Sequence, residues 1–234
     1  MKFLNTFWKV IKSIGTFLYK KDDPQLDEIS EKEYLDIFVK GRKREEIEKS
    51  YQKAWEAKNF EIENYWKRAN YFWAFQVAAF AGYFAVLGSD AYTNSPQVLY
   101  FVICIGAVTS AAWTFINKGS KTWQRHWEIH VDMLENEITG PLYKIVTTQK
   151  TFSVSKINEI VSRFIITIWV VIAVKYFMDH LTVKWNGFQN IDVLVALSTT
   201  VTVYFIASMY FGHGRGRFGN RKVRFFGRKF HTDK

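Results

Sequence analysis

Two histidines four residues apart are the side chains with the clearest potential for chemistry. His126 and His130 would share one face of a helix, a spacing that can hold a zinc ion. The zinc-protease pattern requires glutamate directly after the first histidine, whereas Trp127 stands there, and no third ligand is indicated. The alternative is a polar helix face that makes a pH-sensitive contact. We therefore expect no defined metal site and keep the pair as a candidate pH-sensitive contact or weak metal site.

Other patterns give no support to catalysis. The stretch Asn117-Lys-Gly-Ser-Lys121 lacks the first glycine of a phosphate-binding loop and follows an apolar helix rather than a strand. No serine–histidine–aspartate spacing, carboxylate pair or cysteine–histidine pair indicates a catalytic centre. The single cysteine, Cys104, excludes an internal disulfide. We expect a protein that is not an enzyme and that uses no cofactor.

Polar side chains within apolar stretches form a second candidate site. Gln76 interrupts one stretch, and Ser198, Thr199, Thr200 and Thr202 cluster in another. These groups could line a pore, or they could bond to neighbouring helices and to their own backbone. We favour the second interpretation, because small polar residues are common at helix interfaces in membranes. No ionisable residue lies deep in these stretches, so the sequence contains no relay for pumping ions.

The elements that carry these residues predict an all-α integral membrane protein with four spans. The apolar stretches are Tyr71–Leu87, Val98–Ile116, about Ile160 to Phe177, and Val193–Phe211. Each approaches the ~20 residues that a helix needs to cross a bilayer, where a helix satisfies its own backbone. The short link Gly88–Pro96 makes residues 71–116 a transmembrane hairpin around which we expect the chain to be organised. Residues 157–212 form a second transmembrane pair.

Charged helices extend the first two spans into the cytoplasm. Residues 30–70 carry a thin apolar stripe, and Gly41 predicts a break near its start. Neither glycine nor proline interrupts Arg42–Ala81, which predicts one helix running into the first span. Residues 117–156 begin with a matching stripe that Gly140–Pro141 would end. In the resulting antiparallel stalk, the residues expected to pack together are Trp55 and Trp66 with Trp123 and Trp127.

Both ends of the chain are basic and aromatic. Residues 1–20 predict an amphipathic helix that lies in the membrane interface, or that packs on the cytoplasmic part of the protein. Residues 213–234 interleave arginine and lysine with phenylalanine, a pattern that could bind anionic lipid or single-stranded nucleic acid. Directly after a span, lipid is the simpler partner. The expected lipid-binding residues are Lys9, Lys12, Arg215, Arg217, Arg221, Lys222, Arg224 and Arg228.

The distribution of positive charge predicts the orientation. Of 32 lysines and arginines, 15 precede residue 70, six lie in 117–157 and eight follow Phe211, whereas the link Gly88–Pro96 has none. The positive-inside rule therefore places both termini and the central loop in the cytoplasm. The net charge of +10 suits the anionic surface of an inner leaflet.

Two motifs flank the first hairpin: Trp66-Lys-Arg-Ala-Asn-Tyr-Phe-Trp73, which leads into Phe80–Phe84, and the longer stretch Asn117–Lys144. Together they resemble the RipA family of octameric bacterial membrane proteins, over about residues 45–144. The third and fourth spans and both ends of the chain lie outside this likeness. The resemblance implies a homo-octamer in the bacterial inner membrane and no catalytic residues.

These observations lead to two expected functions. The first is a homo-oligomeric membrane ring that acts without catalysis, either as a scaffold or as a channel-like pore. The alternative is a membrane-tethered protein that binds anionic lipid or nucleic acid through residues 213–234.

Overall fold

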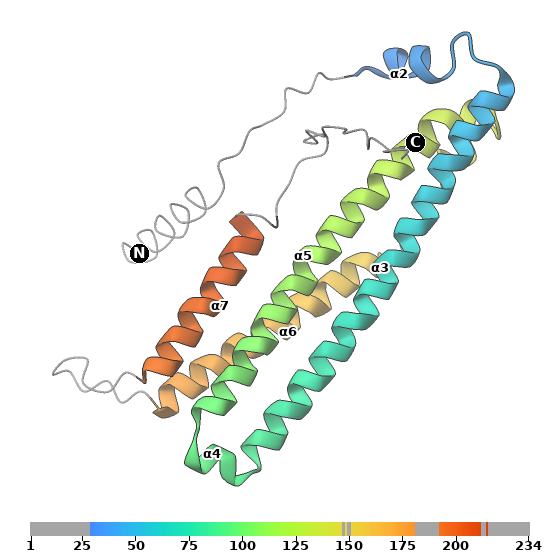
Figure 1. The fold of residues 1–234 in the computed structure, drawn as a ribbon. Coiled ribbons are helices and arrows are strands. Elements are labelled where there is room, and N and C mark those ends of the chain that lie inside the picture. The colour runs from blue at the N-terminus through green and yellow to red at the C-terminus, as the bar shows by residue number, and fades with distance from the viewer. Residues whose placement is uncertain (1–28, 147, 149–150, 181–191, 212–213, 215–234) are drawn as a thin grey trace, which may run out of the picture.

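The computed structural model describes residues 29–146, 148, 151–180, 192–211 and 214, which confirm the all-α class (Figure 1). The helices are α2 (Glu31–Phe38), α3 (Arg44–Leu87), α4 (Asp90–Asn94), α5 (Gln97–Leu134), the 3-10 turn η1 (Glu135–Glu137), α6 (Val154–His180) and α7 (Val193–Phe211). The expected amphipathic helix and, apart from Gly214, the basic tail lie outside the described residues.

The stalk begins with a capped helix and a glycine turn. The Ser30 hydroxyl accepts the Glu33 backbone N–H, and the Glu33 carboxylate accepts the Ser30 N–H, which together form a capping box for α2. Gly41 then takes a φ of +71°, a conformation that glycine adopts without strain, and α3 starts three residues later. The predicted break and the predicted unbroken helix to Leu87 are both confirmed.

The return helix ends earlier than expected. α5 stops at Leu134 and continues only as the 3-10 turn, rather than reaching Gly140–Pro141. The physical reason is the buried carboxylate of Glu135, which accepts the backbone N–H groups of Tyr143 (2.8 Å) and Lys144 (3.2 Å). The chain must turn back to place these groups, and Gly140 allows the turn with a φ of +74°.

The long helix α5 lies at the centre of the molecule. It packs against α3, α6 and α7, and Figure 1 places α3 and α7 on two different sides of it. The arrangement is therefore centred on α5, which is the second arm of the expected hairpin 71–116 and packs most extensively with the first arm, α3. α6 is also longer than its apolar core, because it starts at Val154 with polar turns that pack on α3 and α5.

Among the described residues, three helices are long and apolar enough to cross a membrane. They are Gln97–Glu137, Val154–His180 and Val193–Phe211, which account for three of the four expected spans. The apolar part of α3 differs, because it ends with the helix at Leu87 and is interrupted by Gln76.

Candidate functional sites

A tryptophan from α6 joins three helices inside the apolar region. Trp169 is 0% exposed, and its ring lies so close to Gly106 of α5 that a Cβ there would be 2.2 Å from Cε2. Its Nε1 donates to Oε1 of Gln76 on α3 at 2.7 Å, and the Gln76 amide donates to Thr109 Oγ1 at 2.9 Å. Phe80 stacks on the Trp169 ring with 4.4 Å between centroids. Gln76 therefore acts as a helix contact within the protomer.

The hydroxyl cluster on α7 is also used internally. Ser198, Thr199 and Thr200 each donate to the carbonyl four residues earlier, as hydroxyl groups in membrane helices commonly do. Thr199 in addition bonds to the hydroxyl of Tyr100 on α5 at 2.7 Å. Thr202 lies beside the cluster on the wall of a groove between α5 and α7. These contacts agree with the helix-contact interpretation.

A polar layer crosses the bundle where the spans meet the charged stalk. The Tyr65 hydroxyl accepts Nδ2 of Asn158 at 2.8 Å and donates to the Ser155 carbonyl at 3.2 Å. Asn158 also donates to Oδ1 of Asn117 at 3.3 Å. These bonds tie α3, α5 and α6 together at one level, and they fix the register of three helices that could otherwise slide along apolar faces.

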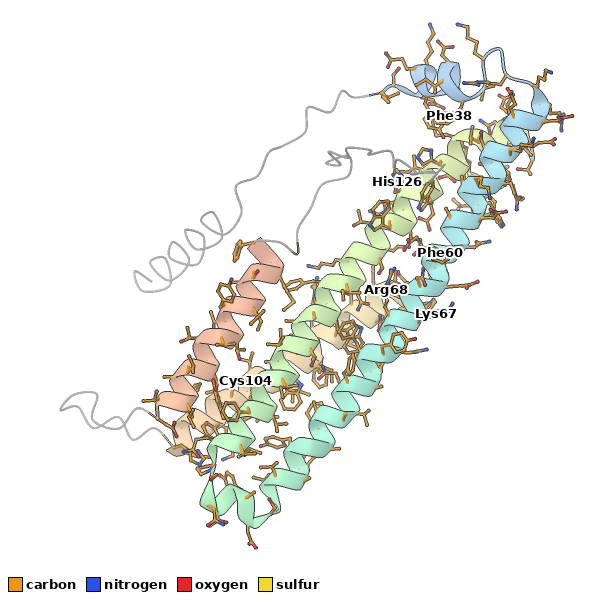
Figure 2. The ribbon with its side chains drawn as sticks, in the orientation of Figure 1. Phe38, Phe60, Lys67, Arg68, Cys104 and His126 are labelled. Carbon is orange, nitrogen blue, oxygen red and sulfur yellow. The ribbon has the colours of Figure 1, made fainter. Side chains whose placement is uncertain are left out.

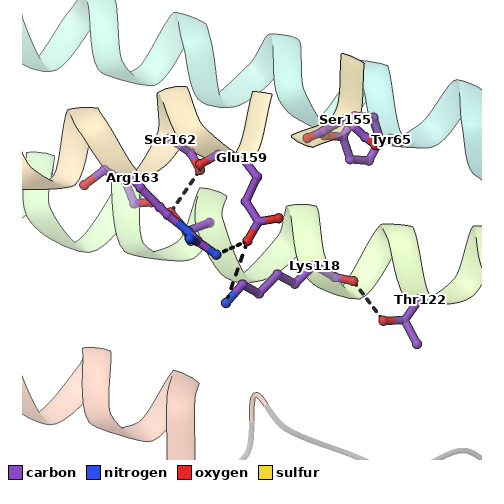
Figure 3. A network of polar contacts seen from close by, with 9 residues as sticks. Tyr65, Lys118, Thr122, Ser155, Glu159, Ser162 and Arg163 are labelled. Atoms are coloured by element: carbon purple, nitrogen blue, oxygen red, sulfur yellow. Dashed lines mark hydrogen bonds and ion pairs between the residues drawn. The ribbon is translucent and has the colours of Figure 1, made fainter. Parts of the chain in front are cut away.

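Charged side chains of α5 and α6 lie close to this layer (Figure 3). Glu159 pairs with Arg163 one turn later on α6, a spacing at which oppositely charged side chains of a helix can meet. Glu159 also lies 3.8 Å from Lys118 on α5, and the cluster keeps a net positive charge. On α3, Arg68 donates to the Ser120 hydroxyl at 2.8 Å. Such cations suit the level of the lipid phosphates at a membrane surface.

The two histidines lie further along the stalk, where α2 packs on α5. Figure 2 shows Phe38 and His126 at this end of the molecule. The Tyr34 hydroxyl of α2 bonds to Nδ1 of His130 at 2.7 Å, and the Phe38 ring lies edge-on to His130 at 6.3 Å. Within the described residues, no group of three or more metal-binding side chains surrounds the pair. The contact to α2 gives the pH-sensitive interpretation a structural basis.

We predict that docking of α2 weakens in acid. Burial, followed by the nearby His126, lowers the pKa of His130, while burial raises the pKa of Tyr34 to about 12, so that its hydroxyl remains a donor. A lowered histidine pKa means that docking is strongest above the ordinary pKa of about 6.5 and is lost as the pH falls below it. Amide exchange in α2, corrected for intrinsic rates, should therefore be faster at pH 5.5 than at pH 7.5. His130→Gln should remove this difference, and a difference that persists would contradict the prediction.

The four tryptophans expected in the stalk occupy different environments. Trp55 packs on Tyr143, with 5.2 Å between ring centroids, and Lys58 Nζ lies 3.3 Å above its ring as a cation–π contact. Trp66 is 40% exposed and Trp123 is 38% exposed. The expected packing of Trp55 and Trp66 with Trp123 and Trp127 stays a prediction.

Residues 48–178 match the model of the octameric membrane protein family (8xMP). This chain belongs to that family. The matched region of this chain contains almost all of α3, the whole of α5 and most of α6, and the residues of the polar layer and of the Trp169 contacts lie within it. The chain is accordingly a multi-pass membrane protein.

The family match covers more of the chain than the resemblance found from the sequence, but it supports a broader family name. The match continues to residue 178, so the third span, which the likeness over 45–144 excluded, is part of the family region. The narrower name RipA is not shown by this match and stays a resemblance. The chain matches no curated protein and no solved structure.

Some functional residues were missed from the sequence, and others lie outside the described part. The importance of Trp169 could have been recognised from the sequence. It lies in the middle of an apolar stretch, whereas tryptophans of membrane proteins concentrate at the membrane–water interfaces. No sequence pattern singled out Tyr34 or Glu135, since only the fold brings them to their hydrogen-bond partners. The expected lipid-binding residues Lys9, Lys12, Arg215, Arg217, Arg221, Lys222, Arg224 and Arg228 lie outside the described residues and stay predictions.

Proposed function

We propose that this chain is a non-catalytic subunit of a homo-octameric ring in the bacterial inner membrane, and that the ring acts as a scaffold. The name of the family supports the octamer. In this proposal the membrane helices anchor and join the subunits, and the stalks present cytoplasmic proteins with a ring of binding surfaces.

One observation favours a scaffold over a pore. The polar side chains within the apolar helices bond inside the protomer: Gln76 is 1% exposed and holds Trp169 and Thr109, and Thr199 holds Tyr100. A water-filled pore needs polar or charged groups directed into it. The exposed membrane faces instead carry apolar residues such as Phe75 and Val171, which suit lipid or another helix.

The stalk supports the binding role. Phe60 on α3 is 61% exposed and Ile129 on α5 is 55% exposed, although both lie beyond the charged residues that mark the membrane boundary (Figure 2 shows Phe60). Large apolar side chains that are exposed to water are available for contacts with other proteins. In the proposed ring they contact neighbouring stalks or cytoplasmic partners.

The proposal includes four spans, with Tyr71–Leu87 of α3 as the first. This segment runs antiparallel to the apolar part of α5 and shares the Trp169 contacts with α6, so it lies at the same depth as two helices that are apolar enough to cross. A short polar helix, α4, then connects the two spans on the outer side. The positive-inside rule supports cytoplasmic termini.

The test is to determine subunit number and conductance on the same preparation. We expect native mass spectrometry of the protein in lipid nanodiscs to give eight copies, and planar bilayers containing the same octamer to show no single-channel currents. Cation or anion currents that depend on the protein would contradict the scaffold. A monomeric mass would contradict the octamer.

A further inference from the structure

An apolar groove between α5 and α7 is not filled by the contacts described above. It has a volume of about 590 Å³, and Cys104 lies in it on the side of α5 that faces α7 (Figure 2). Residues of α5 and of α7 form its two walls, and they include Phe101, Ile105, Val108, Leu197, Val201 and Phe205. A groove of this composition accepts apolar side chains or acyl chains.

The opposite edge of the protomer has a row of small exposed side chains. On α3, Gln76 and Ala79 are buried against the bundle, whereas Ala74, Ala78, Ala81 and Ala85 are exposed. Ala78 and Ala81 each follow a buried residue by two positions, about 200° around the helix, so they face away from α5. Small residues on one face let another helix approach closely, and Phe75 and Phe84 flank them as exposed ridges.

The two surfaces lie at the same depth. Gln76 of α3 contacts Thr109 of α5, and the two helices run antiparallel. Ala81 lies five residues after Gln76 and Cys104 lies five residues before Thr109, so Ala81 and Cys104 are at the same level. A closed ring of identical subunits needs two different faces at equal height, because each protomer contacts its neighbours head to tail. The α3 edge and the α5–α7 groove lie on two different sides of α5 and meet this requirement (Figure 1).

We propose that the exposed alanine face of α3 (Ala74, Ala78, Ala81 and Ala85) docks into the α5–α7 groove of the neighbouring copy and forms the membrane interface of the ring. The proposal rests on the homo-octamer proposed above. It assigns the groove to a second copy of this chain rather than to lipid, because a ring of eight must cover one such pair of faces in every protomer.

Cysteine cross-linking tests this interface directly, because Cys104 is the single cysteine of the chain. In full-length protein in bacterial membranes, Ala81→Cys should form disulfides between neighbours on mild oxidation and give a covalent ladder that extends beyond dimers. Ala78→Cys and Ala85→Cys, one turn to either side, should give weaker ladders. The matched control is Val171→Cys on α6: Val171 is 61% exposed and, counted from the Trp169–Gly106 contact, also level with Cys104. This control and the double variant Ala81→Cys/Cys104→Ser should give no ladder.

Bulky substitutions provide a second measurement that does not depend on disulfide geometry. Ala81→Trp should shift the native mass from octamer to monomer while leaving the protomer folded, whereas Val171→Trp should leave the octamer intact. An intact octamer that tolerates Ala81→Trp and gives no ladder at any alanine position would overturn this interface, with lipid as the occupant of the groove, while leaving the proposed function standing. A wild-type protein that is monomeric would overturn both.

Discussion

Replacing Gly106 by alanine should destabilise the protein by about 3 kcal/mol, at the upper end of the cost of overpacking a core. The added Cβ would lie 2.2 Å from Cε2 of Trp169, so the ring or one of the two helices must move. Any such shift also stretches the bond from Trp169 Nε1 to Gln76, whose loss leaves buried polar groups unpaired. Thermal unfolding in detergent should show a melting temperature several degrees lower.

The control for this prediction lies on the same helix. A Cβ at Gly119 would meet nothing within 4 Å, so Gly119→Ala should be neutral or slightly stabilising through its higher helix propensity. If the clash is the cause, combining Gly106→Ala with Trp169→Phe should cost less than the sum of the two single variants. Equal melting temperatures for Gly106→Ala and Gly119→Ala would show that α6 does not pack on α5 in this way.

Removing the buried Glu135 carboxylate should cost about 3 kcal/mol, because two partly buried hydrogen bonds from backbone N–H groups to a charged acceptor would be lost. In Glu135→Ala, the segment after Gly140 should detach from the stalk, and Tyr143 should lose its contact with Trp55. Hydrogen exchange should become faster at the amides of Tyr143 and Lys144, and the melting temperature should fall.

Two variants make this result specific to the buried carboxylate. Glu137→Ala changes an exposed residue two positions away and should stay within about 0.5 kcal/mol of wild type. Glu135→Gln keeps one acceptor oxygen and should lie between the alanine variant and wild type. If both glutamate-to-alanine variants behave alike, the carboxylate does not hold the segment.

Local patterns predicted the individual elements well. The apolar run Val193–Phe211 coincides with α7, and the charged-to-apolar helix that begins after Gly41 coincides with α3. These elements could be read from the sequence because periodicity, glycine and the lack of proline act within a few turns of helix. The pairing of Glu159 with Arg163 was predictable for the same reason.

Contacts between distant residues were not predictable in this way. Gln76 stood out as a polar residue in an apolar run, but its partner Trp169 is 93 positions away, and nothing local links them. The histidines were recognised as a contact site, but Tyr34 approaches from 96 positions earlier in the chain. The early end of α5 was missed because glycine and proline were the visible stop signals, whereas the buried Glu135 ends the helix before them.

The continuity of α3 gives the protein a mechanical property. Its 44 residues form one rod of about 66 Å that contains no proline and has Gly82 as its single glycine, so no helix-breaking residue separates its charged part from its apolar part. A sideways force on the stalk tip near Arg44 must therefore tilt the whole rod, with the polar layer around Tyr65 as the fulcrum. The end of the rod near Leu87 would then move in the opposite direction, so a movement at one end of α3 is passed on to its other end.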